Sequence, residues 1–85
     1  MQASVEISLY PLQNGYITPI VDFIGILQKE QSLEVRVNGM STQLFGEFQV
    51  IMKTLTTAME TTFEQYQATV FVMKVVNSCL KDVKM

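Results

Sequence analysis

Two short stretches hold most of the side chains in this chain that can do chemistry. Residues 4–12 read SVEISLYPL, in which polar and apolar residues alternate, and residues 38–47 read NGMSTQLFGE. The alternation has the period of a half-buried β-strand, and its polar face carries a carboxylate, two hydroxyls and a phenol. These groups belong to Glu6, Ser4, Ser8 and Tyr10. A face that can both stack and hydrogen-bond suits a small polar aromatic ligand.

The composition argues against several other kinds of site. The chain has no histidine, which removes the commonest general base and the commonest metal ligand, and Cys79 is its only cysteine. Because no nucleophile–base pair is available, we expect no enzyme activity, no metal and no cofactor. The six basic residues are scattered and the net charge is −2, so we expect no nucleic-acid partner.

The length and the apolar content predict one domain that associates with itself. Eighty-five residues make a single domain, 1–85, and 48% of them are hydrophobic, which is more than one small core easily hides. We expect the surplus to lie in a subunit interface; a compact monomer with a few exposed side chains is the alternative. The apolar runs are shorter than the ~20 residues that span a bilayer, and the N-terminus reads as a strand rather than a signal peptide. We therefore expect a cytoplasmic protein without a membrane partner.

The periodicity predicts six elements in the order β-α-β-β-α-β. The strands are expected at about residues 3–10, 32–38, 40–45 and 68–76. Thr18 is expected to cap the first helix, with Pro19 at its first position. Gly46 is expected to end the third strand, and Glu47 to open the second helix. The last nine residues, 77–85, are expected to form a short helical turn or a frayed tail.

Two β-α-β units joined by a hairpin build a four-stranded antiparallel sheet with both helices on one face, which is the ferredoxin-like α+β fold. Such a fold leaves the second face of the sheet free of helices. Because a large apolar face is a liability in water, we expect two sheets to stack, or edges to pair, in a homodimer or homotetramer. The polar side chains of the first strand would then line a partly enclosed cavity near that interface.

The first strand, the helix start at residues 16–24 and the hairpin NGMSTQLFGEF resemble the thiamine-binding, YkoF-like protein family over about residues 3–76. The resemblance implies a ferredoxin-like fold and dimers or tetramers formed by sheet stacking. For some members it implies binding of thiamine or its hydroxymethylpyrimidine moiety, in thiamine transport, salvage or homeostasis. Because other relatives have no established ligand, a homo-oligomeric structural or regulatory protein without a small-molecule ligand is the alternative.

The resemblance implies a ligand site on the first strand and at the start of the third. Its residues are Glu6, Ser8, Tyr10, Asn38, Met40, Ser41 and Thr42. Hydroxyls and amides both donate to and accept from an aminopyrimidine, and a tyrosine ring can stack on the cationic thiazolium. Glu6 can accept from the amino group or complement the cation, and Met40 offers an adaptable apolar wall. Many relatives carry glycine where this chain has Ser41.

Five of these residues also have a purely structural interpretation. Glu6 can pair with Lys74 across the sheet, and Tyr10 can pack against Tyr16 or the first helix. The hairpin residues can be ordinary turn or strand residues: Asn38, Ser41 and Thr42. Arg36, the only arginine, is expected to be a solvated or interface side chain.

Overall fold

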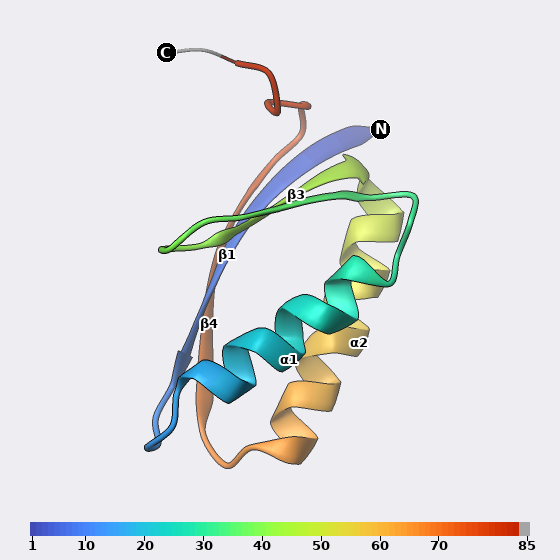
Figure 1. The fold of residues 1–85 in the computed structure, drawn as a ribbon. Coiled ribbons are helices and arrows are strands. Elements are labelled where there is room, and N and C mark those ends of the chain that lie inside the picture. The colour runs from blue at the N-terminus through green and yellow to red at the C-terminus, as the bar shows by residue number, and fades with distance from the viewer. Residues whose placement is uncertain (84–85) are drawn as a thin grey trace.

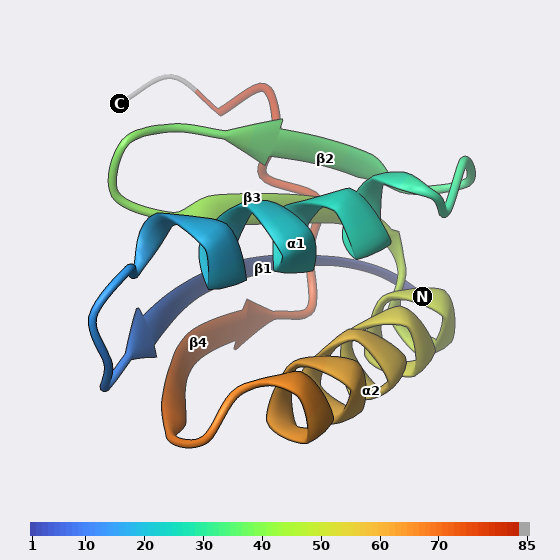
Figure 2. The same ribbon diagram turned by 60° about the horizontal axis from the view of Figure 1, so that its bottom comes forward.

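The computed structural model describes residues 1–83 and has the expected element order (Figure 1). The elements are β1 (Gln2–Pro11), α1 (Ile17–Gln28), β2 (Glu34–Val37), β3 (Thr42–Glu47), α2 (Phe48–Gln65) and β4 (Thr69–Val76). The strands form one antiparallel sheet in the order β2-β3-β1-β4. Both helices lie on the same face of it (Figure 2). The predicted ferredoxin-like α+β fold is confirmed.

The core lies between this face and the two helices. It takes alternate residues of β1 and the apolar stripes of α1 and α2. The fully buried side chains include Val5, Ile7, Phe23, Leu27, Leu44, Ile51 and Leu55. The intervening residues of β1 therefore point to the other face of the sheet, which we call the helix-free face. No helix within residues 1–83 combines the length and the apolar character needed to span a membrane.

The first helix begins earlier than the sequence indicated. Tyr16 occupies the N-cap position and makes no side-chain capping bond, so the predicted cap at Thr18 is wrong. Pro19 is buried in the first turn, where its missing amide costs no hydrogen bond because the first four amides of a helix have no partner within it. Burial of this apolar ring outweighs the capping preference of the hydroxyl beside it.

The junction of β3 and α2 also differs from the expectation at Gly46. This residue lies inside β3, which continues through Glu47. A Cβ at this position would come 2.5 Å from Cδ2 of Leu33, so the glycine allows a close approach rather than ending the strand. Glu47 then caps α2 as expected, because its carboxylate accepts from the amides of Gln49 at 2.7 Å and Val50 at 3.1 Å. The Val50 bond in particular holds the pKa of Glu47 below its usual 4.5.

The C-terminal segment, residues 77–83, was expected to be a helical turn or a frayed tail. Instead it passes as an irregular chain over the helix-free face, near the N-terminal half of β1 (Figure 1). Its backbone is bonded to a side chain of the sheet: Oγ of Ser4 donates to the carbonyl of Ser78 at 2.7 Å and accepts from the amide of Leu80 at 2.9 Å. Positions 84 and 85 of the predicted tail lie outside the described residues.

The strand β4 forms one edge of the sheet and pairs only with β1 among the described strands. Much of its apolar surface is exposed. The exposed side chains are Val70, Val72, Met73, Val75 and Val76. A bare apolar edge of this kind is prone to pair with another chain.

Candidate functional site

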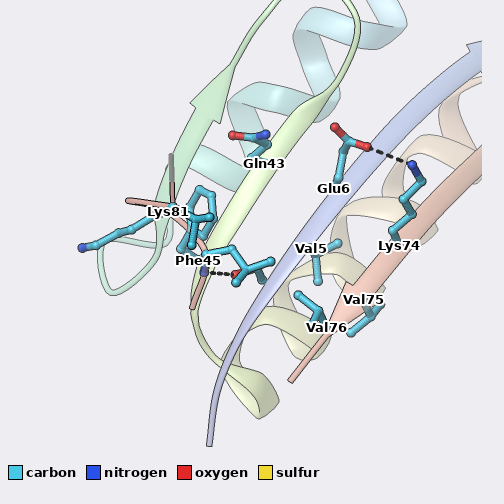
Figure 3. Close-up of a pocket in the computed structure, with 11 residues that line it drawn as sticks. Val5, Glu6, Gln43, Phe45, Lys74, Val75, Val76 and Lys81 are labelled. Carbon is cyan, nitrogen blue, oxygen red and sulfur yellow. Dashed lines mark hydrogen bonds and ion pairs between the residues drawn. The ribbon is translucent and has the colours of Figure 1, made fainter. Parts of the chain in front are cut away.

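A cavity of about 410 Å³ lies between the helix-free face and the C-terminal segment. We call it the segment cavity. The strands β1, β3 and β4 form its floor, and Leu80, Lys81 and Val83 of the segment form one wall (Figure 3). Its volume falls within the range of about 300–1,000 Å³ that is common for small-molecule sites.

The register of the sheet brings a polar row into this cavity. Glu6 of β1 lies directly opposite Gln43 of β3 and Lys74 of β4. Residues that face each other across antiparallel strands share a face of the sheet, so all three side chains point to the helix-free side. The row therefore offers a carboxylate, an amide and an ammonium group to a ligand.

A second row makes the floor apolar. Ser4 lies opposite Phe45 of β3 and Val76 of β4. Leu80 and Val83 approach this part of the cavity from the C-terminal segment. A flat ring can thus be held between apolar side chains while its edge reaches the polar row.

Glu6 is loosely engaged and accessible. Its Oε1 lies 3.9 Å from Nζ of Lys74, and its Oε2 accepts from Oγ of Ser41 at 3.1 Å. The pair with Lys74 considered from the sequence is therefore present. The side chain of Glu6 is 42% exposed and that of Lys74 is 85% exposed, so this long ion pair contributes little to stability. A ligand can replace Lys74 as a partner without leaving a buried charge behind.

Arg36 holds the other side of the segment, a role that the sequence did not reveal. Its Nη1 donates to the carbonyl of Lys81 at 2.7 Å, and its Nη2 lies 3.7 Å from the carboxylate of Asp82. The guanidinium also lies 5.3 Å from the ring centre of Phe45 and is hydrogen-bonded to Glu34. That hydrogen bond is the main cause that lowers the pKa of Glu34 below 4.5.

A second, smaller hollow of about 80 Å³ lies between the β2–β3 hairpin, β1 and α1. We call it the hairpin hollow. Its polar groups mostly bond to the hairpin backbone: Oδ1 of Asn38 accepts from the amides of Met40 at 2.8 Å and Ser41 at 3.0 Å. Oγ of Ser8 donates to the carbonyl of Met40 at 3.3 Å. Asn38 is therefore a turn residue, as its structural interpretation proposed.

The predicted ligand residues do not line one pocket. Glu6 lines the segment cavity. Five others surround the hairpin hollow: Ser8, Asn38, Met40, Ser41 and Thr42. Thr42 is opposite Ile7 on the helix-covered face and is buried, so it cannot share a pocket with Glu6. Tyr10 lies on the helix-free face, but it is 53% exposed and lines neither pocket.

Several residues of the segment cavity were missed by the sequence reasoning. They are Gln43, Phe45, Val76 and Leu80. Alternation about Leu44 could have placed the first two opposite the polar face of β1. The run TVFVMKVV of β4 is apolar in both alternating sets, and nothing local indicated where the C-terminal segment goes.

No group of three or more His, Cys, Asp or Glu side chains within residues 1–83 is placed to hold a metal ion. Cys79 is an exposed free thiol on the C-terminal segment. The segment cavity is lined by a carboxylate, an amide, the ammonium group of Lys74 and apolar side chains.

These features define a small α+β domain with a ligand-sized cavity on the helix-free face of its sheet. The chain belongs to the thiamine-binding protein family, because the model of that family matches residues 5–85. This confirms the resemblance seen in the sequence. A comparison with curated proteins found no match.

The fold is also found in several solved structures. A protein from Streptococcus pneumoniae has a TM-score of 0.87 and 26% identity, over 98% of this chain and 93% of that chain. A hypothetical protein from Methanocaldococcus jannaschii has a TM-score of 0.79 and 26% identity, over 98% and 84% of the two chains. A Thermotoga maritima protein provisionally assigned to thiamine biosynthesis or salvage has a TM-score of 0.74 over 92% and 85%. At 16% identity, that likeness shows the fold alone.

Proposed function

We propose that this protein binds thiamine or its hydroxymethylpyrimidine moiety in the segment cavity, as a binding protein rather than an enzyme. The observation that carries the proposal is the accessible carboxylate of Glu6 in an otherwise largely apolar cavity of about 410 Å³. Membership of the thiamine-binding protein family supports the choice of vitamin. Thiamine transport, salvage or homeostasis is the role we infer for such a binder.

The chemistry of the ligand complements the cavity. The aminopyrimidine carries an exocyclic amino group, which donates hydrogen bonds, and an ionised carboxylate only accepts them. The thiazolium ring is cationic and would favour a place near the same carboxylate. The amide of Gln43 can both donate to and accept from ring nitrogens. Phe45, Val76 and Leu80 can contact the flat faces of the rings.

The hairpin supports this site from outside the cavity. Ser41 donates to Oε2 of Glu6 and so holds the carboxylate in place. Ser41 is thus given a role in positioning Glu6. Ser8, Asn38 and Met40 line the hairpin hollow and not the segment cavity, so in this proposal the ligand does not contact them directly.

A titration tests the proposal. At a ligand concentration 100 times its Kd, a binder gains about 2.7 kcal/mol of stability. Thiamine and hydroxymethylpyrimidine should therefore each raise the melting temperature and give a calorimetric binding signal. Oxythiamine, which has an oxygen in place of the amino group, is the matched control and should bind more weakly. If neither thiamine nor hydroxymethylpyrimidine nor the thiamine phosphates bind, the vitamin hypothesis is wrong.

We also propose that the protein forms a homo-oligomer through the uncovered part of its helix-free face. On that part Tyr10 lies opposite Val70, and Ser8 lies opposite Val72. Tyr10 and both valines are exposed. Because the C-terminal segment occupies the other end of the face, sheet stacking would be confined to this half. The number of subunits and a cytoplasmic location stay predictions.

The oligomer is tested separately from the ligand. Sedimentation of the wild-type chain should give more than one subunit at micromolar concentration, and Val72→Lys should shift it to a monomer. A wild-type chain that stays monomeric contradicts self-association. An oligomer that binds none of the ligands supports the alternative role, a structural or regulatory protein without a small-molecule ligand.

A further inference from the structure

We propose that the C-terminal segment, residues 77–83, is a strap that closes over the ligand, and that Ser4 and Arg36 are the positioning residues that hold it. This inference rests on the proposed function, because it concerns the same cavity. It adds that affinity depends on residues at the far end of the chain, which pack against the ligand from the side opposite the sheet.

The first anchor is a buried one. Ser4 is only 7% exposed, and its hydroxyl uses both its donor and its acceptor capacity on the backbone of the segment. The two residues joined are separated by 74 positions in one bond and by 76 in the other, so these bonds do not belong to a local turn. A β-strand serine on a sheet face has no need of such bonds to form the strand. Their effect is to fix Ser78 and Leu80 above the floor of the cavity.

The second anchor is exposed and weaker. Arg36 donates to the carbonyl of Lys81, and Nζ of Lys81 lies 3.5 Å from Oε1 of Glu34. The charged side chains of this cluster are between 40% and 81% exposed, and exposed ion pairs contribute little individually. The segment is therefore held firmly at residues 78–80 and loosely at residues 81–83. Such a strap can swing open at its end while its base stays attached.

The side chains of the strap favour closure on a ligand. Leu80 and Val83 both line the cavity, yet they are 44% and 53% exposed. A bound aromatic ligand would cover part of this apolar surface, which favours association. The amine of Lys81 instead points away from the cavity (Figure 3). The strap thus presents apolar groups to the ligand and keeps its charge outside.

Ser4→Ala is the direct test, because it removes both bonds of the first anchor and leaves the strand sequence otherwise intact. We expect the Kd for thiamine to rise about 10-fold, mainly through faster dissociation. Ser4→Thr keeps the hydroxyl and should restore most of the affinity. Arg36→Gln should have a smaller effect, about 3-fold. Thr56→Ala removes an exposed hydroxyl from α2 and is the matched control, with no expected change.

Cys79 gives a second readout, since it is the only thiol and lies on the strap. Saturating thiamine should slow the reaction of this thiol with a disulfide reagent in the wild-type chain, and much less in Ser4→Ala. A merely structural role of Ser4 would lower the melting temperature without changing this protection.

The outcomes separate the two proposals. If the wild-type chain binds no thiamine-related ligand, both the proposed function and the strap are overturned. If the wild-type chain binds thiamine and Ser4→Ala binds it equally well with the same thiol protection, only the strap is overturned. A chain shortened to residues 1–76 is a further check where circular dichroism shows that it folds, and undiminished affinity in it would also overturn the strap.

Discussion

The segment cavity and the hairpin hollow lie beside opposite halves of β1 and are built in different ways. The segment cavity, of about 410 Å³, takes residues from three strands and from the C-terminal segment. The hairpin hollow, of about 80 Å³, is made mostly by one turn, a short stretch of β1 and one face of α1. The two stretches richest in suggestive side chains, residues 4–12 and 38–47, therefore contribute to both pockets, and the segment cavity is completed by β4 and the C-terminal segment. The volume of the segment cavity depends on how strands far apart in the sequence pair with one another, which no local motif predicts.

The two regions also differ in how far their polar atoms are already satisfied. In the hairpin, Oδ1 of Asn38 accepts hydrogen bonds from two backbone amides, and the Ser8 hydroxyl donates to the Met40 carbonyl. In the segment cavity, Glu6 holds one serine hydroxyl and a long, exposed contact with Lys74. A ligand gains more from an acceptor that is still accessible than from groups that must first release the backbone. This difference favours the segment cavity as the binding site.

The largest expected effect is on the affinity for thiamine, and it is measured by comparing a substitution in the segment cavity with one in the hairpin. Glu6→Gln keeps the shape but loses the charge and one acceptor, so we expect the Kd for thiamine to rise about 10-fold to 100-fold. Ser8→Ala should change it less than about 3-fold, because its hydroxyl serves the hairpin. Isothermal titration calorimetry measures both.

The same titration with hydroxymethylpyrimidine shows which part of the ligand Glu6 contacts. An equal loss for both ligands indicates the amino group, whereas a loss for thiamine alone indicates the thiazolium cation. If Ser8→Ala were the more damaging change, the ligand would lie at the hairpin and the comparison between the two regions would be reversed.

Local patterns were sufficient to predict the fold. Alternation over residues 4–10, the Asn38-Gly39 turn and the apolar stripes of both helices each depend on neighbours in the sequence. Errors arose where packing outweighed a local preference. Pro19 is buried in the first turn of α1, which begins before the predicted threonine cap, and Gly46 lies within β3, where it allows the close approach of Leu33.

The site was only partly predictable, for geometric reasons. Ser41 and Thr42 are consecutive, so an extended chain sends them to opposite faces, and only one of them can meet Glu6. Tyr10 lies four residues from Glu6 along β1, or about 13 Å, and it does not line the segment cavity. The wall formed by Leu80 could not be predicted, because it is fixed by bonds from Ser4 to Ser78 and Leu80. These residues are separated from Ser4 by 74 and 76 positions in the sequence.

A smaller effect is expected at the hairpin, where Asn38 serves the turn. Asn38→Ala removes an acceptor that holds two amides, and we expect a loss of about 1 kcal/mol in the free energy of unfolding. The affinity for thiamine should not change, since the side chain lies outside the segment cavity. Urea denaturation measures the stability, with an unchanged slope as evidence that the transition is the same. Asn38→Asp keeps the acceptor and is the control. A large loss of affinity in Asn38→Ala would place the ligand at the hairpin instead.

The smallest expected effect is a dependence on pH that affects the segment but not the hairpin. The hydrogen bond from Arg36 lowers the pKa of Glu34 below 4.5 in the folded protein. A carboxyl group with a depressed folded pKa contributes stability above its unfolded pKa and loses that contribution as the pH falls through the folded value. The Arg36 anchor, which also holds Lys81 and Asp82, should therefore weaken below about pH 4.5 and be complete above it.

Hydrogen exchange can resolve this effect at single amides. The Val83 amide donates to the carbonyl of Leu80 at 3.2 Å and reports on the loosely held end of the segment, whereas the Ser41 amide donates to the neutral side chain of Asn38 and reports on the hairpin. After correction for intrinsic exchange rates, protection of Val83 should fall below about pH 4.5 more steeply than that of Ser41. The comparison is needed because the pKa of Glu47 is also lowered, so loss of its cap on α2 in acid would weaken the whole fold. A global loss lowers both protections together, and parallel curves would therefore contradict a separate anchor at Arg36.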